Sequence, residues 1–175
     1  PPGTAFYYLV RASSSCGVGD LGAASAGIPP RTNAACGSGG PPNTTTIDFN
    51  NLTATDVALD GAYPPGVIDW GQGGWYVSGP WQSFTTNSVS FSGPGVTTAG
   101  FSFVTPRILI RLDAYNGGSS TGTVTLSCPG RPTKQVVLAP GAVATIETGW
   151  TGACTPVTVG STNGWNTNFD NLVIY

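Results

Sequence analysis

Apolar and polar residues alternate with a period of two in many short runs along the chain. Phe101 and Phe103 flank Ser102, and Val124 and Leu126 alternate with threonines. A period of two is that of a β-strand, and one polar face per strand indicates antiparallel sheets with the other face in the core. Runs of this kind predict a strand at residues 4–12 and further strands at 46–49, 75–78, 88–92, 100–104, 107–115, 122–127, 134–139, 142–148, 156–160 and 169–175.

Turn-forming residues separate these runs. The chain holds 26 glycines and 15 prolines, a composition that favours short strands joined by tight turns over long helices. Pro140-Gly141, between the runs 134–139 and 142–148, is typical of a tight turn and predicts a hairpin. We therefore expect an all-β fold, an antiparallel two-sheet sandwich of the jelly-roll type, with an N-terminal β segment.

The pattern divides the chain into three parts. Residues 1–36 form a β segment, in which the strand 4–12 precedes a stretch rich in glycine, serine and alanine. Residues 37–44 contain the sequence Gly-Ser-Gly-Gly-Pro-Pro and are expected to be a linker. Residues 45–175 hold the remaining strands and are expected to form the sandwich domain.

Four cysteines occur in a chain without histidine and without a Cys-x-x-Cys motif. Zinc sites normally use such residues, so disulfides are the better interpretation, and they imply an oxidising compartment. Of the three pairings that four cysteines allow, Cys16–Cys36 with Cys128–Cys154 is the most local and is favoured. We therefore expect a secreted protein, extracellular or at the cell surface. We expect no membrane insertion, because no apolar run approaches the roughly 20 residues that a membrane span requires.

Charge and side-chain chemistry exclude two classes of function. Six basic and eight acidic residues give a net charge of −2, so there is no basic patch for nucleic acid. Without histidine there is no Ser-His-Asp or Cys-His arrangement. A glycosidase needs two carboxylates, but Glu147 is expected to be a solvated surface residue and Asp113 has no evident partner in the sequence. We therefore expect no enzyme.

Aromatic residues gather in glycine-rich stretches. Trp75, Tyr76 and Trp81 lie among several glycines, and Trp165 lies in a second loop rich in glycine, asparagine and threonine, residues 161–168. We expect these four rings to be exposed and to form a flat surface on which a sugar ring packs. Trp70 and Trp150 are instead expected to cover the ends of the sandwich. The neighbouring polar residues expected to bind sugar hydroxyls are Gln72, Asn163, Asn166 and Asn168.

The ends of the domain carry a family resemblance. The opening sequence Ile47-Asp48-Phe49-Asn50 and the closing sequence Phe169-Asp170-Asn171-Leu172-Val173-Ile174-Tyr175 resemble those of jelly-roll modules in secreted bacterial proteins, in particular calcium-binding carbohydrate-binding modules. The resemblance covers residues 45–175 as a pattern. It implies that the first and last strands lie side by side and hold a structural calcium ion. The implied ligands are Asp48, Asn50, Asp170 and Asn171, with Asp56, Asp60 or Asp69 completing the shell.

The N-terminal part carries a second, shorter resemblance. The sequence Phe6-Tyr7-Tyr8-Leu9-Val10-Arg11-Ala12, followed by Gly17 and Ser25, resembles the last two strands of a fibronectin type III domain. The earlier strands of such a domain do not occur in this sequence. The resemblance implies a sheet fragment with open edges, which must pair with something else.

Two hypotheses of function follow. The first is a non-catalytic carbohydrate-binding or adhesion module of a secreted protein, which binds a polysaccharide or other glycan on its exposed aromatic residues. The second is a structural subunit of an extracellular filament or surface layer, in which residues 4–12 complete the sheet of an identical subunit by β-strand donation. In that case the aromatic rings are interface anchors.

Overall fold

The computed structural model describes residues 13, 14, 17, 18 and 43–175 of the chain. The chain divides into two units, Pro1–Asn43 and Thr44–Tyr175. In the first unit β1 (Ser13–Ser14) and β2 (Gly17–Val18) pair in antiparallel fashion. The predicted strand at 4–12, the Cys16–Cys36 disulfide and the glycine- and proline-rich stretch 37–42 lie outside the described residues, so they stay predictions.

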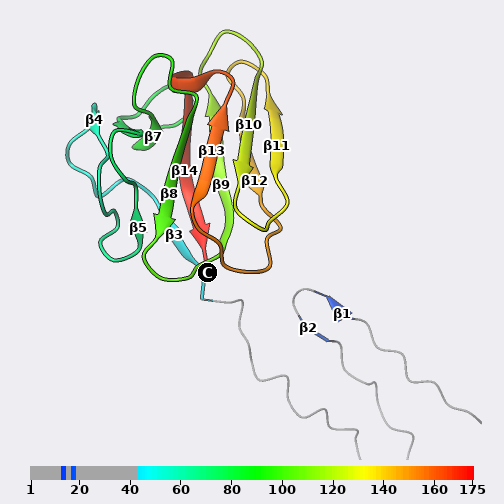
Figure 1. Ribbon diagram of the computed structural model, residues 1–175. Helices are drawn as coiled ribbons and strands as arrows, with labels where there is room; N and C mark the ends of the chain where they lie inside the picture. Colours follow the sequence, from blue (N-terminus) through cyan, green and yellow to red (C-terminus); the bar gives the residue numbers. More distant parts are fainter. Residues whose placement is uncertain (1–12, 15–16, 19–42) are drawn as a thin grey trace, which may run out of the picture. The chain divides into compact units, whose positions relative to one another are not determined.

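The second unit is built from two antiparallel sheets (Figure 1). The first has seven strands, in the order β12 (Val143–Glu147), β9 (Leu109–Asn116), β14 (Thr167–Ile174), β7 (Ser88–Phe91), β6 (Trp75–Ser78) and β4 (Val57–Ala58), with β3 (Thr45–Ile47) also pairing with β14. The second has five strands, in the order β11 (Lys134–Leu138), β10 (Gly122–Ser127), β13 (Val157–Ser161), β8 (Thr98–Phe103) and β5 (Ile68–Asp69). We call them the seven-stranded and the five-stranded sheet.

The order of the strands is that of a jelly roll. The strands β7-β14-β9-β12 of one sheet face the strands β8-β13-β10-β11 of the other. From β7 to β14 the chain passes to the opposite sheet at every connection except the one from β10 to β11. The predicted all-β sandwich is confirmed. Ten strands of the second unit were predicted near their observed bounds, whereas the two-residue strands β4 and β5 are too short for a periodic pattern.

The turn at Pro140-Gly141 is present, but the hairpin predicted around it is wrong. The Ala142 N–H donates to the carbonyl oxygen of Ala139 at 3.1 Å, and Gly141 has φ 75°, a conformation that glycine adopts without a steric penalty. The strands on either side, β11 and β12, belong to different sheets. The turn therefore carries the chain around the edge of the sandwich.

The core between the sheets is rich in aromatic rings, and Trp75 belongs to it. Its side chain is 1% exposed, it stacks on Phe91 at a centroid distance of 5.6 Å, and its Nε1 donates to the carbonyl oxygen of Gly100 in the opposite sheet at 2.9 Å. The expectation that Trp75 is exposed is wrong. In β6 the residues Trp75 and Val77 point inward, so the strand period overrides the glycines that precede it.

Trp70 and Trp150, which were expected to cover the ends of the sandwich, are buried. Each indole N–H has an acceptor, because Nε1 of Trp70 donates to the carbonyl oxygen of Tyr63 at 2.6 Å and that of Trp150 to the carbonyl oxygen of Pro132 at 2.8 Å. Burial of these large rings therefore leaves no indole donor without a partner.

The predicted disulfide Cys128–Cys154 is confirmed. Cys128 follows β10 and Cys154 precedes β13, and these strands are neighbours in the five-stranded sheet, where Ser127 pairs with Thr158. The Cα atoms are 6.1 Å apart and the bond closes a separation of 26 residues that includes β11 and β12. The disulfide therefore joins the end of β10 to the start of β13, on either side of the segment that holds β11 and β12.

Candidate functional site

A pocket of about 290 Å³ lies on the outer face of the seven-stranded sheet. Three neighbouring strands line it, and Ser78, Ser90 and Asn168 form its polar floor. Tyr76 and Ser78 alternate with the inward residues of β6, Ser90 of β7 pairs with Tyr76, and Asn168 comes from β14. Cross-strand partners point to the same side of a sheet, so the pairing register brings these side chains together.

Trp81 forms one wall of the pocket. Its residue is anchored by a pair of backbone hydrogen bonds with Phe84, at 2.7 and 3.1 Å. The indole packs edge-on against Tyr115, with centroids 5.5 Å apart, and its outer edge lies on the backbone of Gly117. A Cβ atom at Gly117 would lie only 2.2 Å from the Trp81 ring, so this close approach requires glycine.

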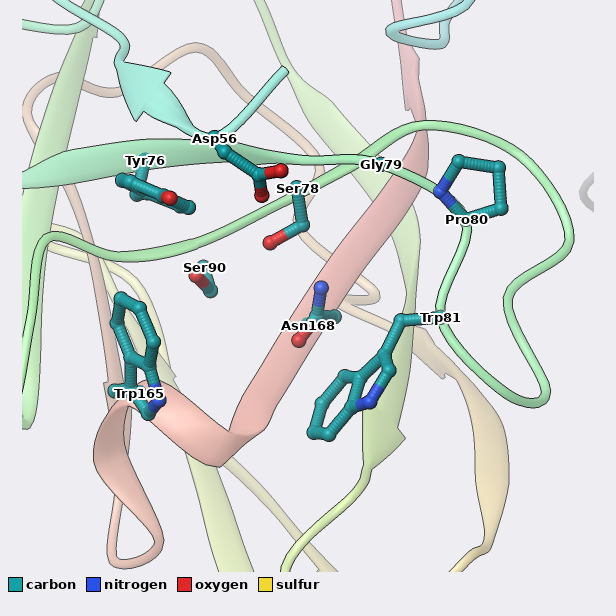
Figure 2. Close-up of a pocket in the computed structure, with 9 residues that line it drawn as sticks. All are labelled: Asp56, Tyr76, Ser78, Gly79, Pro80, Trp81, Ser90, Trp165 and Asn168. Atoms are coloured by element: carbon teal, nitrogen blue, oxygen red, sulfur yellow. The ribbon is translucent and has the colours of Figure 1, made fainter.

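Trp165 and Tyr76 form the opposite wall (Figure 2). Trp165 lies in the short 3-10 helix η1 (Gly164–Asn166) and is 38% exposed. Its ring centroid is 5.3 Å from that of Tyr76, with the planes tilted by 50°. Ser90 and Asn168 lie between this pair and Trp81 in the close-up. The pocket is therefore an aromatic enclosure with a polar floor.

Two of the floor residues, Ser90 and Asn168, are buried. Ser90 is 2% exposed and Asn168 1%. The Asn168 Nδ2 donates to the hydroxyl oxygen of Ser88 at 2.8 Å, which fixes the plane of the amide. Within the described residues its Oδ1 atom accepts no hydrogen bond, so this oxygen is available to a ligand.

Asp56 supplies the charge at the rim of the pocket. It precedes β4, has φ 61°, and its N–H donates to the carbonyl oxygen of Val77 at 2.7 Å. Desolvation, followed by the charge of Asp56, raises the pKa of the Tyr76 phenol above its ordinary value. Among the described residues that line the pocket, Asp56 is the one charged side chain.

The structure brings together three of the four aromatic residues expected to contact a sugar, namely Tyr76, Trp81 and Trp165. The expected polar residues other than Asn168 do not line the pocket. Gln72 is exposed in the loop before β6. Asn163 instead joins two loops, since its Nδ2 donates to the Asn116 Oδ1 at 2.8 Å and to the Ser120 carbonyl at 2.7 Å.

Asn166, the remaining expected residue, is exposed, and its backbone N–H donates to the carbonyl of Asn163 at 3.1 Å. The polar residues that line the pocket and were not expected are Asp56, Ser78 and Ser90. Ser78 and Ser90 were recognisable only as outward positions of predicted strands. Asp56 lies 20 residues before Tyr76 in the sequence and is brought near it by the pairing of Val57 with Val77.

Four of the residues expected to bind calcium, Asp48, Asn50, Asp170 and Asn171, lie near the junction of the first and last strands. Ile47 of β3 pairs with Leu172 of β14, so these strands are side by side as expected. Asp170 is 2% exposed, its Oδ1 accepts from the Asn171 N–H at 2.7 Å, and its Oδ2 accepts from the Thr86 hydroxyl at 3.1 Å. Burial raises the pKa of Asp170 from 3.8 to about 6.

The charges of two further carboxylates add to this shift, although the hydrogen bonds oppose it. These carboxylates belong to Asp48 and Asp113, so the charges of two acidic side chains act on Asp170. Asn50 is exposed and its N–H donates to the Asp48 Oδ1 at 3.2 Å. Asn171 has φ 51° and its Nδ2 donates to the Asp113 Oδ2 at 3.0 Å. Within the described part of the chain, no group of three or more acidic, cysteine or histidine residues is close enough together to bind a metal ion by itself.

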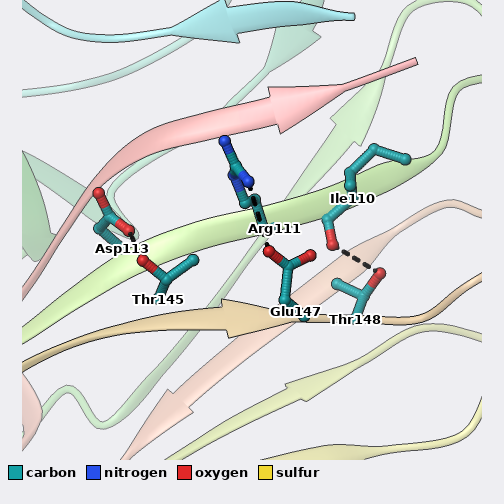
Figure 3. A network of polar contacts seen from close by, with 6 residues as sticks. All are labelled: Ile110, Arg111, Asp113, Thr145, Glu147 and Thr148. Carbon is teal, nitrogen blue, oxygen red and sulfur yellow. Dashed lines mark hydrogen bonds and ion pairs between the residues drawn. The ribbon is translucent and has the colours of Figure 1, made fainter. Parts of the chain in front are cut away.

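Asp113 of β9 and Glu147 of β12 belong to a set of polar contacts on the outer face of the seven-stranded sheet (Figure 3). Asp113, for which the sequence shows no evident partner, accepts hydrogen bonds from Thr145 and from Asn171. Glu147 is exposed, as expected, and forms an ion pair with Arg111 at 3.4 Å. An exposed pair of this kind contributes little to stability.

The fold and the site together define a jelly-roll β-sandwich domain with an aromatic-walled pocket on the outer face of its larger sheet. Neither the models of known protein families nor the curated protein sequences contain a match to this chain. No helix among the described residues has the length and apolar character of a membrane span.

Proposed function

We propose that this domain is a non-catalytic module of a secreted protein and binds a carbohydrate in the pocket on the seven-stranded sheet. The observation that carries the proposal is the convergence of Tyr76, Trp81 and Trp165, from three separate segments, around a polar floor. The face of a sugar ring presents C–H groups that pack on aromatic rings, and its edge presents hydroxyls that need hydrogen-bonding partners. The pocket offers both.

The polar floor supports binding of hydroxyl groups. The free Oδ1 of Asn168 accepts a hydrogen bond, and the hydroxyls of Ser78 and Ser90 both donate and accept. Asn168 is held in place by Ser88, so a sugar that binds there meets an amide that is already oriented. Such preorganisation lowers the entropic cost of binding.

The pocket supports binding rather than hydrolysis. Glycoside hydrolysis uses a pair of carboxylates about 5–9 Å apart on either side of the scissile bond. Asp56 is the one carboxylate among the described residues that line the pocket, so a bound glycan would meet no second carboxylate there. We accordingly expect binding without turnover.

The test compares single variants of the two walls. Trp81→Ala and Trp165→Ala each remove one ring of the pocket, and we expect each to weaken glycan binding about 5- to 30-fold, which corresponds to about 1–2 kcal/mol. Tyr175→Ala is the matched control, because Tyr175 is an aromatic residue that is 50% exposed and does not line the pocket. Binding is measured by isothermal titration calorimetry after a screen of immobilised polysaccharides.

The same screen can refute the proposal. If the native chain is retained on none of the polysaccharides, or if both tryptophan variants bind as well as Tyr175→Ala, the pocket is not a carbohydrate site. Trp75→Ala is unsuitable for this purpose, because Trp75 lies in the core and its loss would perturb folding itself.

We further propose that a structural calcium ion binds at the junction of the first and last strands, with Asp48 and Asp170 as carboxylate ligands. The donor chemistry suits calcium, since the pKa of the Asp170 carboxyl is raised by burial and further by the charges of Asp48 and Asp113, and a cation would offset those charges. Calcium that binds the folded domain raises its melting temperature. A melting temperature that is the same in calcium and in chelator would refute this site.

The filament hypothesis concerns residues 4–12, which lie outside the described residues. Donation of that strand to an identical subunit therefore stays a prediction, and electron microscopy of the purified chain would test it directly.

A further inference from the structure

The pocket carries one formal negative charge and no positive one. Its lining contains Asp56 but none of the basic side chains in the described part of the chain, which are Arg107, Arg111, Arg131 and Lys134. Arg111 is paired with Glu147, and Arg131 donates to the carbonyl of Ala153 at 3.1 Å. A sugar acid bound in the pocket would thus face a like charge without any basic partner.

Aromatic rings beside a carboxylate attract a cation for two reasons. The faces of tryptophan and tyrosine rings carry negative electrostatic potential, and a nearby ammonium group is drawn to them. The carboxylate adds a direct charge attraction. In this pocket the two features coincide, because the Asp56 charge acts on the Tyr76 phenol and the Tyr76 ring contacts that of Trp165. Figure 2 shows the Asp56 carboxylate above the pocket, beside Tyr76 and Ser78.

We propose that the pocket selects glycans whose sugar units carry a free, protonated amino group, and that the ammonium group binds beside Asp56 and the ring of Tyr76. This inference rests on the proposed carbohydrate-binding function and specifies its ligand class. The polar floor favours an amino sugar over a small tetraalkylammonium ion, which cannot donate hydrogen bonds to Asn168 or accept them from Ser90.

The test uses three tetrasaccharides that differ at one position. β-1,4-linked tetramers of glucosamine, of N-acetylglucosamine and of glucose carry an ammonium, an acetamide and a hydroxyl group, respectively, at carbon 2. In mildly acidic buffer at low salt, we expect the glucosamine tetramer to bind about tenfold tighter than the glucose tetramer, through the combined charge and ring attraction. Because pH is held constant, titration of other groups affects the three ligands alike.

Asp56→Asn isolates the charge. Asparagine tolerates the left-handed backbone conformation found at this position, so we expect the loop to keep its shape. In this variant the preference for the glucosamine tetramer over the glucose tetramer should fall to twofold or less. Glu147→Gln is the matched control, since it removes one negative charge from an exposed position outside the pocket, and it should keep the preference.

The outcomes separate this inference from the proposed function. Equal binding of all three tetramers by the native chain would overturn the inference and leave carbohydrate binding intact. A preference that survives in Asp56→Asn, or that is lost equally in Glu147→Gln, would also overturn it. If the native chain binds no tetramer and no polysaccharide, the proposed function fails and the inference fails with it.

Discussion

Replacing Trp75 by phenylalanine tests whether this tryptophan is a core residue. Trp75 is 1% exposed and its Nε1 donates to the Gly100 carbonyl across the sandwich at 2.9 Å. Loss of that hydrogen bond costs about 1 kcal/mol. Full truncation of a buried tryptophan costs about 3–5 kcal/mol, and phenylalanine retains more than half of the ring, so the packing loss is about 1–2 kcal/mol. We expect Trp75→Phe to lower the free energy of unfolding by about 2–3 kcal/mol.

Urea denaturation of the native chain and of the variant measures this difference. Trp165→Phe makes the same chemical change at a side chain that is 38% exposed, so it should change the free energy of unfolding by less than about 0.5 kcal/mol. For glycan binding we expect the reverse: Trp165→Phe should weaken it because the variant alters the pocket wall, whereas Trp75→Phe should not. Equal unfolding midpoints for Trp75→Phe and the native chain would refute the burial of Trp75.

Three further predictions concern the disulfide, the Trp81 wall and the buried carboxylate. The double variant Cys128→Ala, Cys154→Ala should lower the free energy of unfolding in urea by about 3.5 kcal/mol, because the disulfide closes a separation of 26 residues and restricts the unfolded chain; a loss below about 1 kcal/mol would contradict this. Gly117→Ala places a Cβ atom 2.2 Å from the Trp81 ring, so titration calorimetry should show about tenfold weaker glycan binding, and unchanged affinity would show that the ring position is not required. In chelator, Asp170 should lower stability as pH rises from 4 to 7.5, because its pKa in the folded state is raised from 3.8 to about 6 and the folded state therefore holds the proton more tightly. In Asp170→Asn the loss of unfolding free energy between pH 4 and pH 7.5 should be smaller than in the native chain by about 1–2 kcal/mol, after allowance for solvent screening. Identical pH profiles of the two proteins would contradict this.

The strands were predictable because their signal is local. Alternation along a single run, such as Val124 and Leu126 among threonines, already defines which residues point inward, and both are buried. The error at Trp75 arose from weighting the surrounding glycines above the alternation of Trp75 and Val77 with Tyr76 and Ser78. The period of two correctly places Trp75 and Val77 on the inward face of the strand.

The pocket floor was not predictable because it depends on pairing between distant segments. Ser90 reaches the pocket through its register with Tyr76, and Asp56 through the pairing of β4 with β6. No local pattern specifies those registers. Asn163 was expected to bind sugar because it lies two residues from Trp165 in the sequence. Its amide instead donates hydrogen bonds to Asn116 and Ser120.

The segment between β6 and β7 links the two proposed sites. Trp81 forms the pocket wall, whereas Thr86 donates to the buried Asp170 carboxylate at 3.1 Å. The next residue, Asn87, donates to the carbonyls of Phe49 and Leu52 at 3.2 and 3.0 Å.

A single short connection is therefore fixed at one end by the strand junction and at the other by the pocket. Loss of the Thr86 hydroxyl in Thr86→Val leaves Asp170 with one hydrogen bond fewer and releases the connection there. We expect this variant to lower both the melting temperature and the glycan affinity. Trp81→Ala should lower the glycan affinity with a much smaller effect on melting, because Trp81 is only half-buried. If Thr86→Val changes the melting temperature but leaves glycan affinity unchanged, the two sites are independent.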